Sequence, residues 1–381
     1  MKVVHVGGLN YKNGGPSLSM ALTIKGLRQH GVDAIGVSRA LEDGDKLVCD
    51  SSYCHFFKRP RFEVFGWQYI PDVDSTFDEI GKVDIMHLQG IWSSHMHSAA
   101  VYARHHNIPY IIAPRGSLYP QAMAIAPWKK KLSMVLYQEK DLKEAVCIQA
   151  TCEDELRYYR EMGFKNPVAI IPNPIDSENY VKPDIPKPEK FRFGYIGRLH
   201  PRKRVERLIY AFADKREVFD NCELFIIGAD VKEYEDFLKE EVKRLHLSNV
   251  HFSGFLRGEE KDKALCSLSC MINPSDFENF GNVVNEALMR GVPVIATTGS
   301  PWEKLIDYDC GWWVENDQET ITKTMVEAYN RLSKGDGLMG ANGRRLVQEE
   351  FSVSVLGEKM KSLYEWILGN GSRPSFVGTC D

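Results

Sequence analysis

The feature that most constrains the fold of this chain is a repeated alternation of short apolar runs with helix-length amphipathic segments. Helical patterns such as Leu18–His30 and Val205–Phe212 separate most of the runs. This alternation predicts parallel sheets with helices on both faces. Because the whole pattern occurs twice, we infer two doubly wound α/β domains. The predicted strands are Val3–Val6, Ile85–Leu88, Tyr110–Ala113, Ile148–Ala150 and Val168–Ile171 in the first domain, and Phe193–Ile196, Leu224–Ile227, Val250–Phe252, Cys270–Ile272 and Val294–Ala296 in the second.

A charged, proline-containing stretch marks the boundary between the two domains. It runs from 176 to 190 and has prolines at positions 183, 186 and 188, so it should be extended and poorly helical. We therefore predict a first domain over 1–176, a linker over 177–190 and a second domain over 191–350. A last helix is expected within 351–369, followed by a flexible tail over 370–381.

The composition is that of a folded protein with no strong attraction to nucleic acid. The chain has 381 residues, of which 43% are hydrophobic, and a net charge of −4. These values allow a core in each domain and give no case for a nucleic-acid partner. The nine cysteines are scattered and include no C-x-x-C pair, which favours a reducing compartment. Since the first strand starts almost at once and no apolar run reaches ~18–20 residues, we expect a cytoplasmic protein without a signal peptide.

The segment E-N-F-G-N-V-V-N-E places two carboxylates, Glu278 and Glu286, eight positions apart. We predict a loop and then a short helix, with Asn282 as its N-cap and Gly291 just beyond its end. The free N–H groups of a helix start attract phosphate. Two acceptors beside such a start suit a ligand with phosphate in the middle and hydroxyls at both ends, such as a nucleotide sugar. Two solvated glutamates near a helix start are the plain alternative.

A basic segment directly follows the first predicted strand of the second domain. Gly197 allows a tight turn, Arg198 can donate two hydrogen bonds to phosphate oxygens, and Lys203 adds a movable positive charge. Together these groups can neutralise a departing nucleoside diphosphate without a metal. A solvated basic loop is the alternative, and we expect Arg202 and Arg204 to be surface residues.

Two polar segments of the first domain also follow predicted strands. Gly14 and Gly15 lie in N-G-G-P-S, where backbone amides can approach a phosphate or a sugar, although a plain glycine turn fits equally well. The absence of G-x-G-x-x-G argues against dinucleotide binding. After the strand that ends at Leu88, His95 is a candidate for contact with an acceptor. No metal site is expected there, because no carboxylate or cysteine keeps a ligand spacing.

Taken together, these motifs resemble those of the retaining glycosyltransferases of the GT4 type, which have the two-domain GT-B fold. Arg198 and Lys203 match the family's G-R-x(4)-K element, and Glu278 and Glu286 match its E-x7-E motif, flanked by P-S-D-F and E-A-L-M-R-G-V-P-V-I-A. The resemblance extends over essentially the whole chain. It implies two Rossmann-like domains that face an interdomain cleft, with the final helix crossing back to the first domain.

The resemblance also implies roles for the residues of the E-x7-E segment. Glu286 should accept hydrogen bonds from the ribose diol, and Glu278 should hold hydroxyls of the transferred sugar. The sugar and the phosphate should be lined by the backbone amides of Phe280, Gly281 and Asn282.

The implied catalysis is electrostatic. Arg198 and Lys203 should stabilise negative charge as the diphosphate departs. The loop with Gly14 and Gly15 should lie beside the diphosphate and the acceptor. No residue is an obvious nucleophile, so we expect a front-face mechanism in which the leaving phosphate takes the acceptor's proton.

Three segments differ from the family's pattern or have a structural interpretation. Arg115 stands in P-R-G where several relatives have a histidine, and we predict that it contacts the donor. Pro174 replaces a glycine in I-P-N-P-I-D, which should stiffen the entry to the linker. Thr151, with Asp154 three residues later, is predicted to be the N-cap of a helix.

The implied activity is retaining, metal-independent transfer of a hexosyl unit from a UDP- or GDP-sugar, with no cofactor. The acceptor would be a glycan or an undecaprenyl-diphosphate-linked glycan, in the synthesis of a capsule, an exopolysaccharide or an O-antigen. Two alternatives remain. A GT-B nucleotide-sugar epimerase needs acid and base groups that the sequence does not reveal, and a non-catalytic nucleotide-sugar-binding protein would bind the donor without turnover.

One further segment is both basic and amphipathic. Trp128 precedes three lysines, and an apolar stretch continues to Tyr137. The pattern fits an interfacial helix on the inner face of the cytoplasmic membrane, and it fits an ordinary surface helix equally well.

Overall fold

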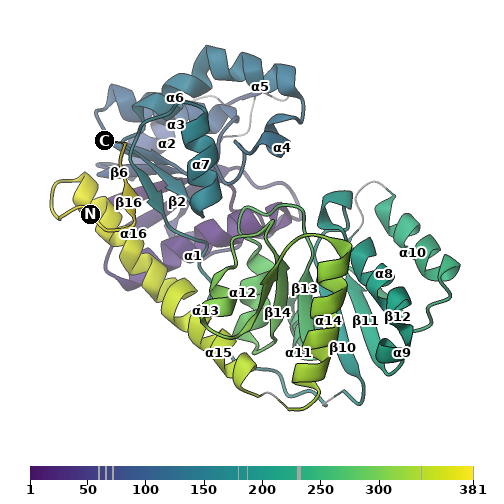
Figure 1. Cartoon of the computed structure of the whole chain (residues 1–381). Coiled ribbons are helices and arrows are strands. Elements are labelled where there is room, and N and C mark those ends of the chain that lie inside the picture. Colours follow the sequence, from purple (N-terminus) through teal and green to yellow (C-terminus); the bar gives the residue numbers. More distant parts are fainter. Residues whose placement is uncertain are drawn as a thin grey trace. The chain divides into compact units, whose positions relative to one another are not determined.

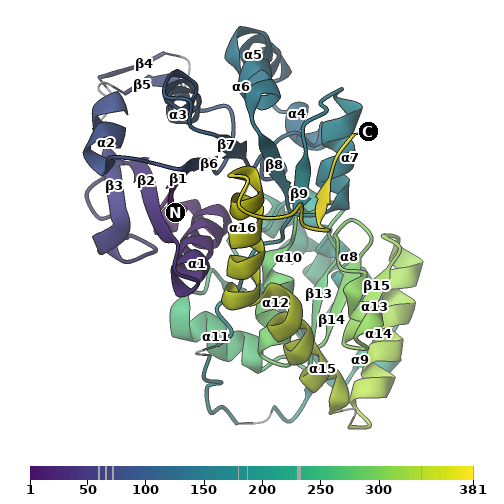
Figure 2. The same cartoon turned by 90° about the vertical axis from the view of Figure 1, so that its left-hand side faces the viewer.

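A computed structural model describes residues 1–58, 61–64, 67–70, 73–178, 180–186, 188–229, 233–335 and 337–380 of the chain (Figures 1 and 2). Internal contacts divide it into two compact units. The first consists of Met1–Asp176 with Phe351–Asp381, and the second of Ser177–Glu350. Within the described residues, no helix combines the length and the hydrophobicity needed to span a bilayer.

The first unit is built on a parallel sheet with one antiparallel edge strand. The strand order is β16-β9-β8-β7-β6-β1-β2-β3. Successive strands run outward in opposite directions from the centre, so the topological switch point lies between β1 and β6. The strands are β1 (Lys2–Val6), β2 (Asp33–Arg39), β3 (Cys54–Phe57), β6 (Ile85–Leu88), β7 (Tyr110–Ile112), β8 (Cys147–Ala150), β9 (Val168–Ile170) and β16 (Val377–Gly378), and a separate hairpin joins β4 (Phe62–Val64) to β5 (Trp67–Tyr69).

Helices cover both faces of this sheet, and an apolar core lies on each face. The helical segments are η1 (Tyr11–Asn13), α1 (Gly15–Gln29), η2 (Ser51–Tyr53), α2 (Val73–Ile80), α3 (Ser94–His105), α4 (Pro120–Met123), α5 (Pro127–Ser133), the π-helical η3 (Met134–Gln138), α6 (Glu139–Glu144), α7 (Glu153–Glu161) and α16 (Val353–Ile367).

The last helix, α16, packs against α1, as expected for a helix that returns to the first domain. A Cβ on Gly26 would clash with the carbonyl oxygen of Val353, and one on Gly357 would clash with the backbone of Gly26. Two glycines therefore allow the helix axes to approach closely. His30 Nε2 adds a hydrogen bond of 2.8 Å to the carbonyl oxygen of Ser354.

The C-terminal residues differ from the predicted flexible tail. Val377 and Gly378 form β16, which pairs antiparallel with β9 at Ala169 and Val168. Val377 is buried in the core. The edge strand β9 supplies unpaired backbone groups, and two residues are enough to use them.

The second unit contains a six-stranded, fully parallel sheet in the order β12-β11-β10-β13-β14-β15. This is the order of a Rossmann sheet, with the switch point between β10 and β13. The strands are β10 (Phe191–Ile196), β11 (Cys222–Ile227), β12 (Val250–Gly254), β13 (Cys270–Asn273), β14 (Val294–Thr297) and β15 (Gly311–Val314). The helical segments are η4 (Pro201–Lys203), α8 (Glu206–Asp214), α9 (Arg216–Phe219), α10 (Tyr234–Arg244), α11 (Gly258–Cys266), α12 (Asn282–Met289), α13 (Lys304–Asp307), α14 (Gln318–Leu332), α15 (Leu338–Leu346) and the π-helical η5 (Val347–Phe351).

The stretch predicted as a linker groups with the second unit. Its described residues form neither helix nor strand. Tyr180 contacts α11, because its hydroxyl lies 3.4 Å from Asp262 Oδ2 and 3.2 Å from Cys266 Sγ. The guanidinium of Arg290 lies over the Tyr180 ring at 4.9 Å. The start of this stretch is therefore held against the second unit.

Candidate active site

Three loops meet at the carboxyl edge of the second sheet, beside its switch point. They follow the neighbouring strands β10, β13 and β14. The amide of Asp276 donates to the carbonyl of Arg202 at 2.9 Å, which joins the first two loops. The amide of Glu278 donates to the carbonyl of Gly299 at 2.7 Å, which joins the second to the third. Ligands of open α/β sheets bind at this edge, so these loops form the first place to seek a site.

Glu278 and Lys203 form an ion pair across two of these loops. Each side chain is only 12% exposed. Ser275 Oγ also donates to Glu278 Oε1 at 3.1 Å. Burial lowers the pKa of Lys203, the Glu278 charge opposes that shift, and the charges of Arg202 and Arg198 add to it. The sequence predicted separate substrate contacts for the two residues, and the structure brings them together as partners.

Arg198 differs from Lys203 because its side chain is exposed. Its carbonyl accepts a hydrogen bond of 2.8 Å from the hydroxyl of Tyr195. Within the part of the chain that the structure describes, its guanidinium has no recorded hydrogen bond or ion pair. Arg198 therefore presents a free fork of donors close to the buried Lys203–Glu278 pair.

Gly197 is needed because a side chain would not fit at this position, and not because its backbone is left-handed. A Cβ at this position would lie 2.8 Å from the Tyr195 hydroxyl oxygen. The Tyr195 ring is buried below the loop, and its hydroxyl fixes the position of Arg198. The predicted tight turn is thus a close approach of the backbone to this tyrosine.

The start of α12 differs in one residue from the prediction. Gly281, not Asn282, is the N-cap, and Asn282 is the first helical residue. The N-cap has φ 80° and ψ 62°, a left-handed conformation that glycine adopts without strain. The buried Phe280 lies under this turn, where its carbonyl accepts a hydrogen bond of 2.6 Å from Trp302 Nε1. The first turn of α12 therefore follows directly on the loop that carries Glu278.

A buried amide donor also lies beside this turn. Asn273 is 1% exposed, and among the described residues its Nδ2 has no hydrogen-bond partner. This nitrogen lies 3.4 Å from the position that a Cβ on Gly281 would occupy. The sequence analysis did not identify Asn273, because an asparagine at the end of a strand has no distinctive pattern.

Glu286 lies one turn into α12, as predicted, and has its own cationic partner. It forms an ion pair with Lys261 of α11, and its side chain is 18% exposed. Lys261 was missed, because a lysine in a charged helix carries no signal of its own. The two carboxylates of the E-x7-E motif are thus each paired with one lysine.

Arg204 is a surface residue, as predicted, with a side chain that is 42% exposed, and it also links two of the loops. Its Nε donates to Asp276 Oδ2 at 2.6 Å, and Asn316 Nδ2 donates to the other oxygen of the same carboxylate at 2.9 Å. Arg204 is the C-cap of η4 and has a left-handed backbone with φ 52°. The cluster holds the loop after β10 against the loop after β13.

In the first unit, Gly14 and Gly15 form the start of α1 at that unit's switch point. Gly14 is the N-cap with φ 67°, and Gly15 is the first helical residue. The space around Gly14 is open. The backbone amide of Tyr11 donates a hydrogen bond of 2.8 Å to the carbonyl of Lys46, which holds the preceding turn in place. The loop can therefore present helix amides to an anion, as the sequence suggested.

Arg115 is used within the first unit, although a donor contact was predicted for it. Its two terminal nitrogens donate to Asn173 Oδ1 and Gln89 Oε1. Its Nε is enclosed, and burial lowers the pKa of the guanidinium to about 10. Its backbone is left-handed, with φ 56°. The guanidinium is thus divided between two protein groups rather than free for a phosphate.

Buried histidines extend this network. Gln89 Nε2 lies 2.9 Å from His5 Nδ1, and the Tyr364 hydroxyl lies 2.8 Å from His87 Nδ1 and 3.2 Å from His5 Nε2. Burial lowers the pKa of His5 to about 3 and that of His87 well below its usual range. His87 is therefore a neutral hydrogen-bonding residue near the end of β6.

A buried glutamate organises the loop beside Arg115 and corrects the predicted helix cap. Cys152 is the N-cap of α7, and Thr151 pairs with Glu155 rather than Asp154. Glu155 accepts from the Gly116 amide at 2.5 Å and from the Thr151 amide at 2.8 Å. Burial raises the pKa of Glu155, while these hydrogen bonds lower it.

His95 lies inside the first unit, so it does not offer the acceptor contact that was predicted. It is buried on α3, with its ring centroid 6.2 Å from that of Phe57. Burial lowers its pKa to about 3, which keeps the ring neutral.

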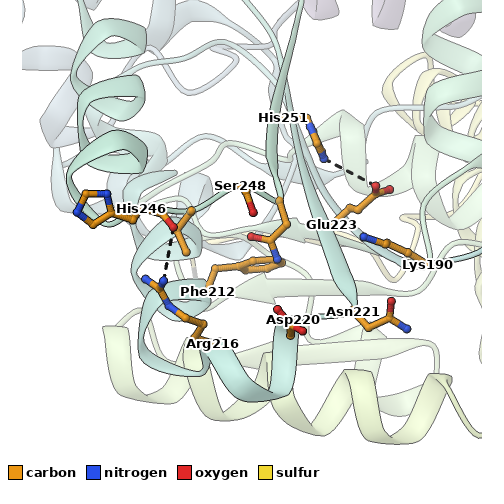
Figure 3. Close-up of a pocket in the computed structure, with 11 residues that line it drawn as sticks. Lys190, Phe212, Arg216, Asp220, Asn221, Glu223, His246, Ser248 and His251 are labelled. Carbon is orange, nitrogen blue, oxygen red and sulfur yellow. Dashed lines mark hydrogen bonds and ion pairs between the residues drawn. The ribbon is translucent and has the colours of Figure 1, made fainter.

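A cavity of about 470 Å³ lies at the other end of the second sheet (Figure 3). Lys190, Asn221 and Asn249 contribute to its wall, and each directly precedes or lies close before a strand. Two of its groups, His251 Nε2 and Glu223 Oε1, lie 3.8 Å apart. Because it is at the amino end of the strands, this cavity is separate from the loops described above.

Comparison with known proteins identifies the family. A model described as "Glycosyl transferase 4-like domain" matches residues 14–174, and one described as "Glycosyl transferases group 1" matches residues 176–335. The chain belongs to the group 1 glycosyltransferases of the GT4 type and has the GT-B fold.

Individual relatives align with part of the chain. It is 27% identical over 185 residues to the capsular polysaccharide biosynthesis glycosyltransferase CapM of Staphylococcus aureus, covering 47% of each chain. It is 37% identical over 180 residues to a GDP-mannose-dependent alpha-mannosyltransferase of Mycolicibacterium smegmatis, covering 47% of this chain and 44% of that one. The chain thus spans about half the length of these curated relatives. The Anabaena protein Alr3699/HepE, solved with UDP and glucose, superposes with a TM-score of 0.72 at 17% identity, covering 96% and 100% of the two chains.

Proposed function

We propose that this protein transfers a hexosyl unit from a nucleotide sugar to a hydroxyl of a glycan acceptor, with retention of anomeric configuration. One observation carries the proposal. The Lys203–Glu278 pair, the exposed Arg198 and the start of α12 gather at the switch point of the second sheet. This arrangement offers two cations, a helix N-terminus and a carboxylate to a ligand that combines phosphate with hydroxyls.

The ion pair is suited to an exchange of partners. In the ligand-free protein, Lys203 and Glu278 neutralise each other, which limits the penalty for burying two charges. A bound diphosphate would give Lys203 a new anion, and a bound sugar would give Glu278 hydroxyl donors. Arg198 is exposed and can add a two-pronged contact to the same phosphate.

Glu286 is suited to hold the ribose. It lies one turn beyond the start of α12 and eight residues after Glu278 in the sequence. Its ion pair with Lys261 orients the carboxylate. We expect its oxygens to accept hydrogen bonds from the 2′- and 3′-hydroxyls.

The proposed reaction needs no protein nucleophile. The bond between the anomeric carbon and the phosphate oxygen breaks, and the acceptor oxygen bonds to the same face of that carbon. The proton of the acceptor hydroxyl passes to the leaving phosphate. Arg198 and Lys203 stabilise the charge that develops on the diphosphate, so we propose that no metal is required.

The donor and acceptor are proposed from relatives. A mannosyltransferase dependent on GDP-mannose and a structural neighbour bound to UDP support a nucleotide-sugar donor and leave the base open. The capsule-forming relative supports a polysaccharide pathway such as capsule, exopolysaccharide or O-antigen synthesis. We propose a cytoplasmic reaction on a glycan, free or linked to undecaprenyl diphosphate.

The test compares two neighbouring arginines. Arg198→Ala should reduce transfer by about 10²–10³-fold without unfolding the protein. The matched variant Arg202→Ala should keep most of the activity, because the Arg202 side chain lies over the Phe277 ring at 5.0 Å. Release of nucleoside diphosphate and formation of glycosylated product are measured together. Full activity of the Arg198 variant, or loss of activity with EDTA, would contradict the proposal.

The same assay separates the alternatives. An epimerase would change the donor sugar in the absence of any acceptor. A binding protein would retain the nucleotide sugar without releasing a nucleoside diphosphate. Acceptor-dependent release is the result that the proposal requires.

A further inference from the structure

The connection between β7 and β8 exposes an unusual set of apolar side chains. Five of them are between 52% and 73% exposed within a stretch of twelve residues: Ile125, Trp128, Leu132, Val135 and Leu136. The last four have the spacing i, i+4, i+7 and i+8, so they lie along one side of the helix formed by α5 and η3. We call these five side chains the α5 face.

The opposite side of this helix is fixed to the first unit. The Tyr137 hydroxyl donates to the Trp92 carbonyl at 2.8 Å, and the Trp92 amide donates to Gln138 Oε1 at 2.8 Å. Met134 packs against the apolar core. Because this side is anchored, the helix cannot rotate to bury the α5 face. Figures 1 and 2 show the α5 helix at the periphery of the first unit.

The charges along this segment are all positive as far as Gln138, and Glu139, one turn beyond Val135, is paired with Lys143. Lys129 and Lys131 are exposed, and Lys129 Nζ lies 5.6 Å from the centroid of the Trp128 ring. Lys130 donates to the Ala122 carbonyl. No aspartate or glutamate occurs between Leu118 and Gln138. An apolar strip with a tryptophan and flanking lysines is complementary to the headgroup region of an anionic bilayer.

We propose that the α5 face docks the protein onto an anionic lipid surface. The apolar side chains would enter the headgroup–acyl boundary, and Lys129 and Lys131 would contact lipid phosphates. A protein partner is less well matched, since such interfaces are depleted in lysine.

Docking through the α5 face would also bring one edge of the first sheet close to the membrane. The connection that carries the α5 face begins at the carboxyl end of β7 and passes through Arg115 and Gly116. Docking would therefore hold that edge near the lipid headgroups, where the diphosphate and first sugars of a lipid-linked glycan stand. This consequence rests on the proposed glycosyl transfer, whereas the docking itself does not.

The test measures binding to vesicles with no substrate present. Sedimentation is compared for vesicles of phosphatidylcholine alone and vesicles with about a third phosphatidylglycerol. The wild-type protein should bind the anionic vesicles preferentially, and high salt should weaken binding. Val135→Ser/Leu136→Ser should lower the partition coefficient by at least about tenfold, and Lys129→Glu/Lys131→Glu should lower it by about tenfold or more.

Matched variants control for loss of exposed apolar groups. Val181→Ser/Leu338→Ser removes side chains that are 84% and 72% exposed elsewhere, and it should bind like the wild type. All of these positions are exposed, so circular dichroism should show unchanged folding. Binding that is absent, indifferent to lipid charge or unchanged in the α5-face variants would overturn the proposal.

A second measurement distinguishes lipid from a second copy of the chain. Analytical ultracentrifugation that shows self-association, abolished by Val135→Ser/Leu136→Ser, together with no vesicle binding, would assign the face to an interface between copies and overturn docking on lipid. Transfer to a short soluble acceptor needs no vesicle and should be unchanged in these variants. Failure of transfer and failure of docking are therefore separate results.

Discussion

The two units have the same sheet topology around their switch points, yet they use the polar residues there differently. In the first unit, Arg115, Gln89, His5 and Tyr364 bind one another in a closed network. In the second, Lys203 and Glu278 form one ion pair, and Arg198 remains exposed.

This difference shows that a strand-end arginine has no fixed role. Arg115 and Arg198 both follow a buried strand, and both sit beside a glycine in sequence. One guanidinium is divided between protein oxygens, while the other faces solvent. The first unit thus gains rigidity at its switch point, and the second keeps charge available for a ligand.

The largest expected effect comes from the buried ion pair. Lys203→Met removes the cation and leaves Glu278 with one hydroxyl donor, so transfer should fall by about 10²–10³-fold. Stability should also fall, by about 2–4 kcal/mol, because a mostly buried carboxylate loses its partner. Activity assays and urea unfolding measure the two effects.

The double variant Lys203→Met/Glu278→Gln sharpens this result. It removes both charges, so it should regain most of the stability and none of the activity. A double variant as unstable as the single one would show that the pair is not coupled. Recovery of activity would show that neither charge serves the reaction.

The second prediction concerns Arg115, for which we expect a loss of stability with little loss of ligand affinity. Arg115→Met should destabilise the protein by about 2–4 kcal/mol, because Gln89 and Asn173 lose their buried donor. The affinity for nucleoside diphosphate should change less than about twofold. Calorimetric titration that shows a large loss of affinity with normal stability would instead restore Arg115 as a donor-binding residue.

The sequence predicted most of the strands but not the partners of their side chains. Ile85–Leu88 matches β6 at both ends, since continuous apolar runs are typical of buried parallel strands. The strand β2 was missed because Gly36 interrupts its apolar run. A Cβ there would lie 2.8 Å from Leu9 Cδ1, so tertiary packing rather than strand propensity selects the glycine.

For the candidate site as well, the sequence predicted the segments but not the contacts between their side chains. The segments with Lys203 and Glu278 contact each other through an ion pair, and Glu286 lies one turn into α12. The pairing of Lys203 with Glu278, and the inward path of Arg115, depend on long-range packing. A left-handed residue such as Arg115 has no local sequence pattern that distinguishes an inward from an outward side chain.

The third prediction concerns acid stability. His5 and His95 have folded pKa values of about 3, against 6.5 when unfolded. The unfolded chain therefore binds more protons below pH 6.5, so stability is fully present above that pH and is lost as the pH falls toward 3. Each histidine should contribute a slope of about 1.4 kcal/mol per pH unit.

Urea unfolding between pH 7 and pH 5 measures this slope. His95→Asn should reduce the slope by nearly one proton at the acid end of this range and by less near pH 7, whatever its effect on absolute stability. A slope that does not change in this variant would show that His95 is not held neutral in the folded protein.

The smallest expected effect concerns the ribose. Glu286→Gln should weaken nucleoside diphosphate binding by about five- to tenfold, with little change in stability. The wild-type protein should lose a similar factor with a 2′-deoxy nucleotide, and the variant should not discriminate between the two nucleotides. If both proteins discriminate equally between the two nucleotides, Glu286 does not bind the ribose.

The central claim is that a nucleoside diphosphate binds where the loops after β10 and β13 meet. Hydrogen–deuterium exchange of the intact protein, with and without UDP or GDP, tests it most directly. The account predicts protection in residues 197–204 and 275–286, with little change around the Lys190–His251 cavity. Protection at that cavity, without protection of these two loops, would contradict it.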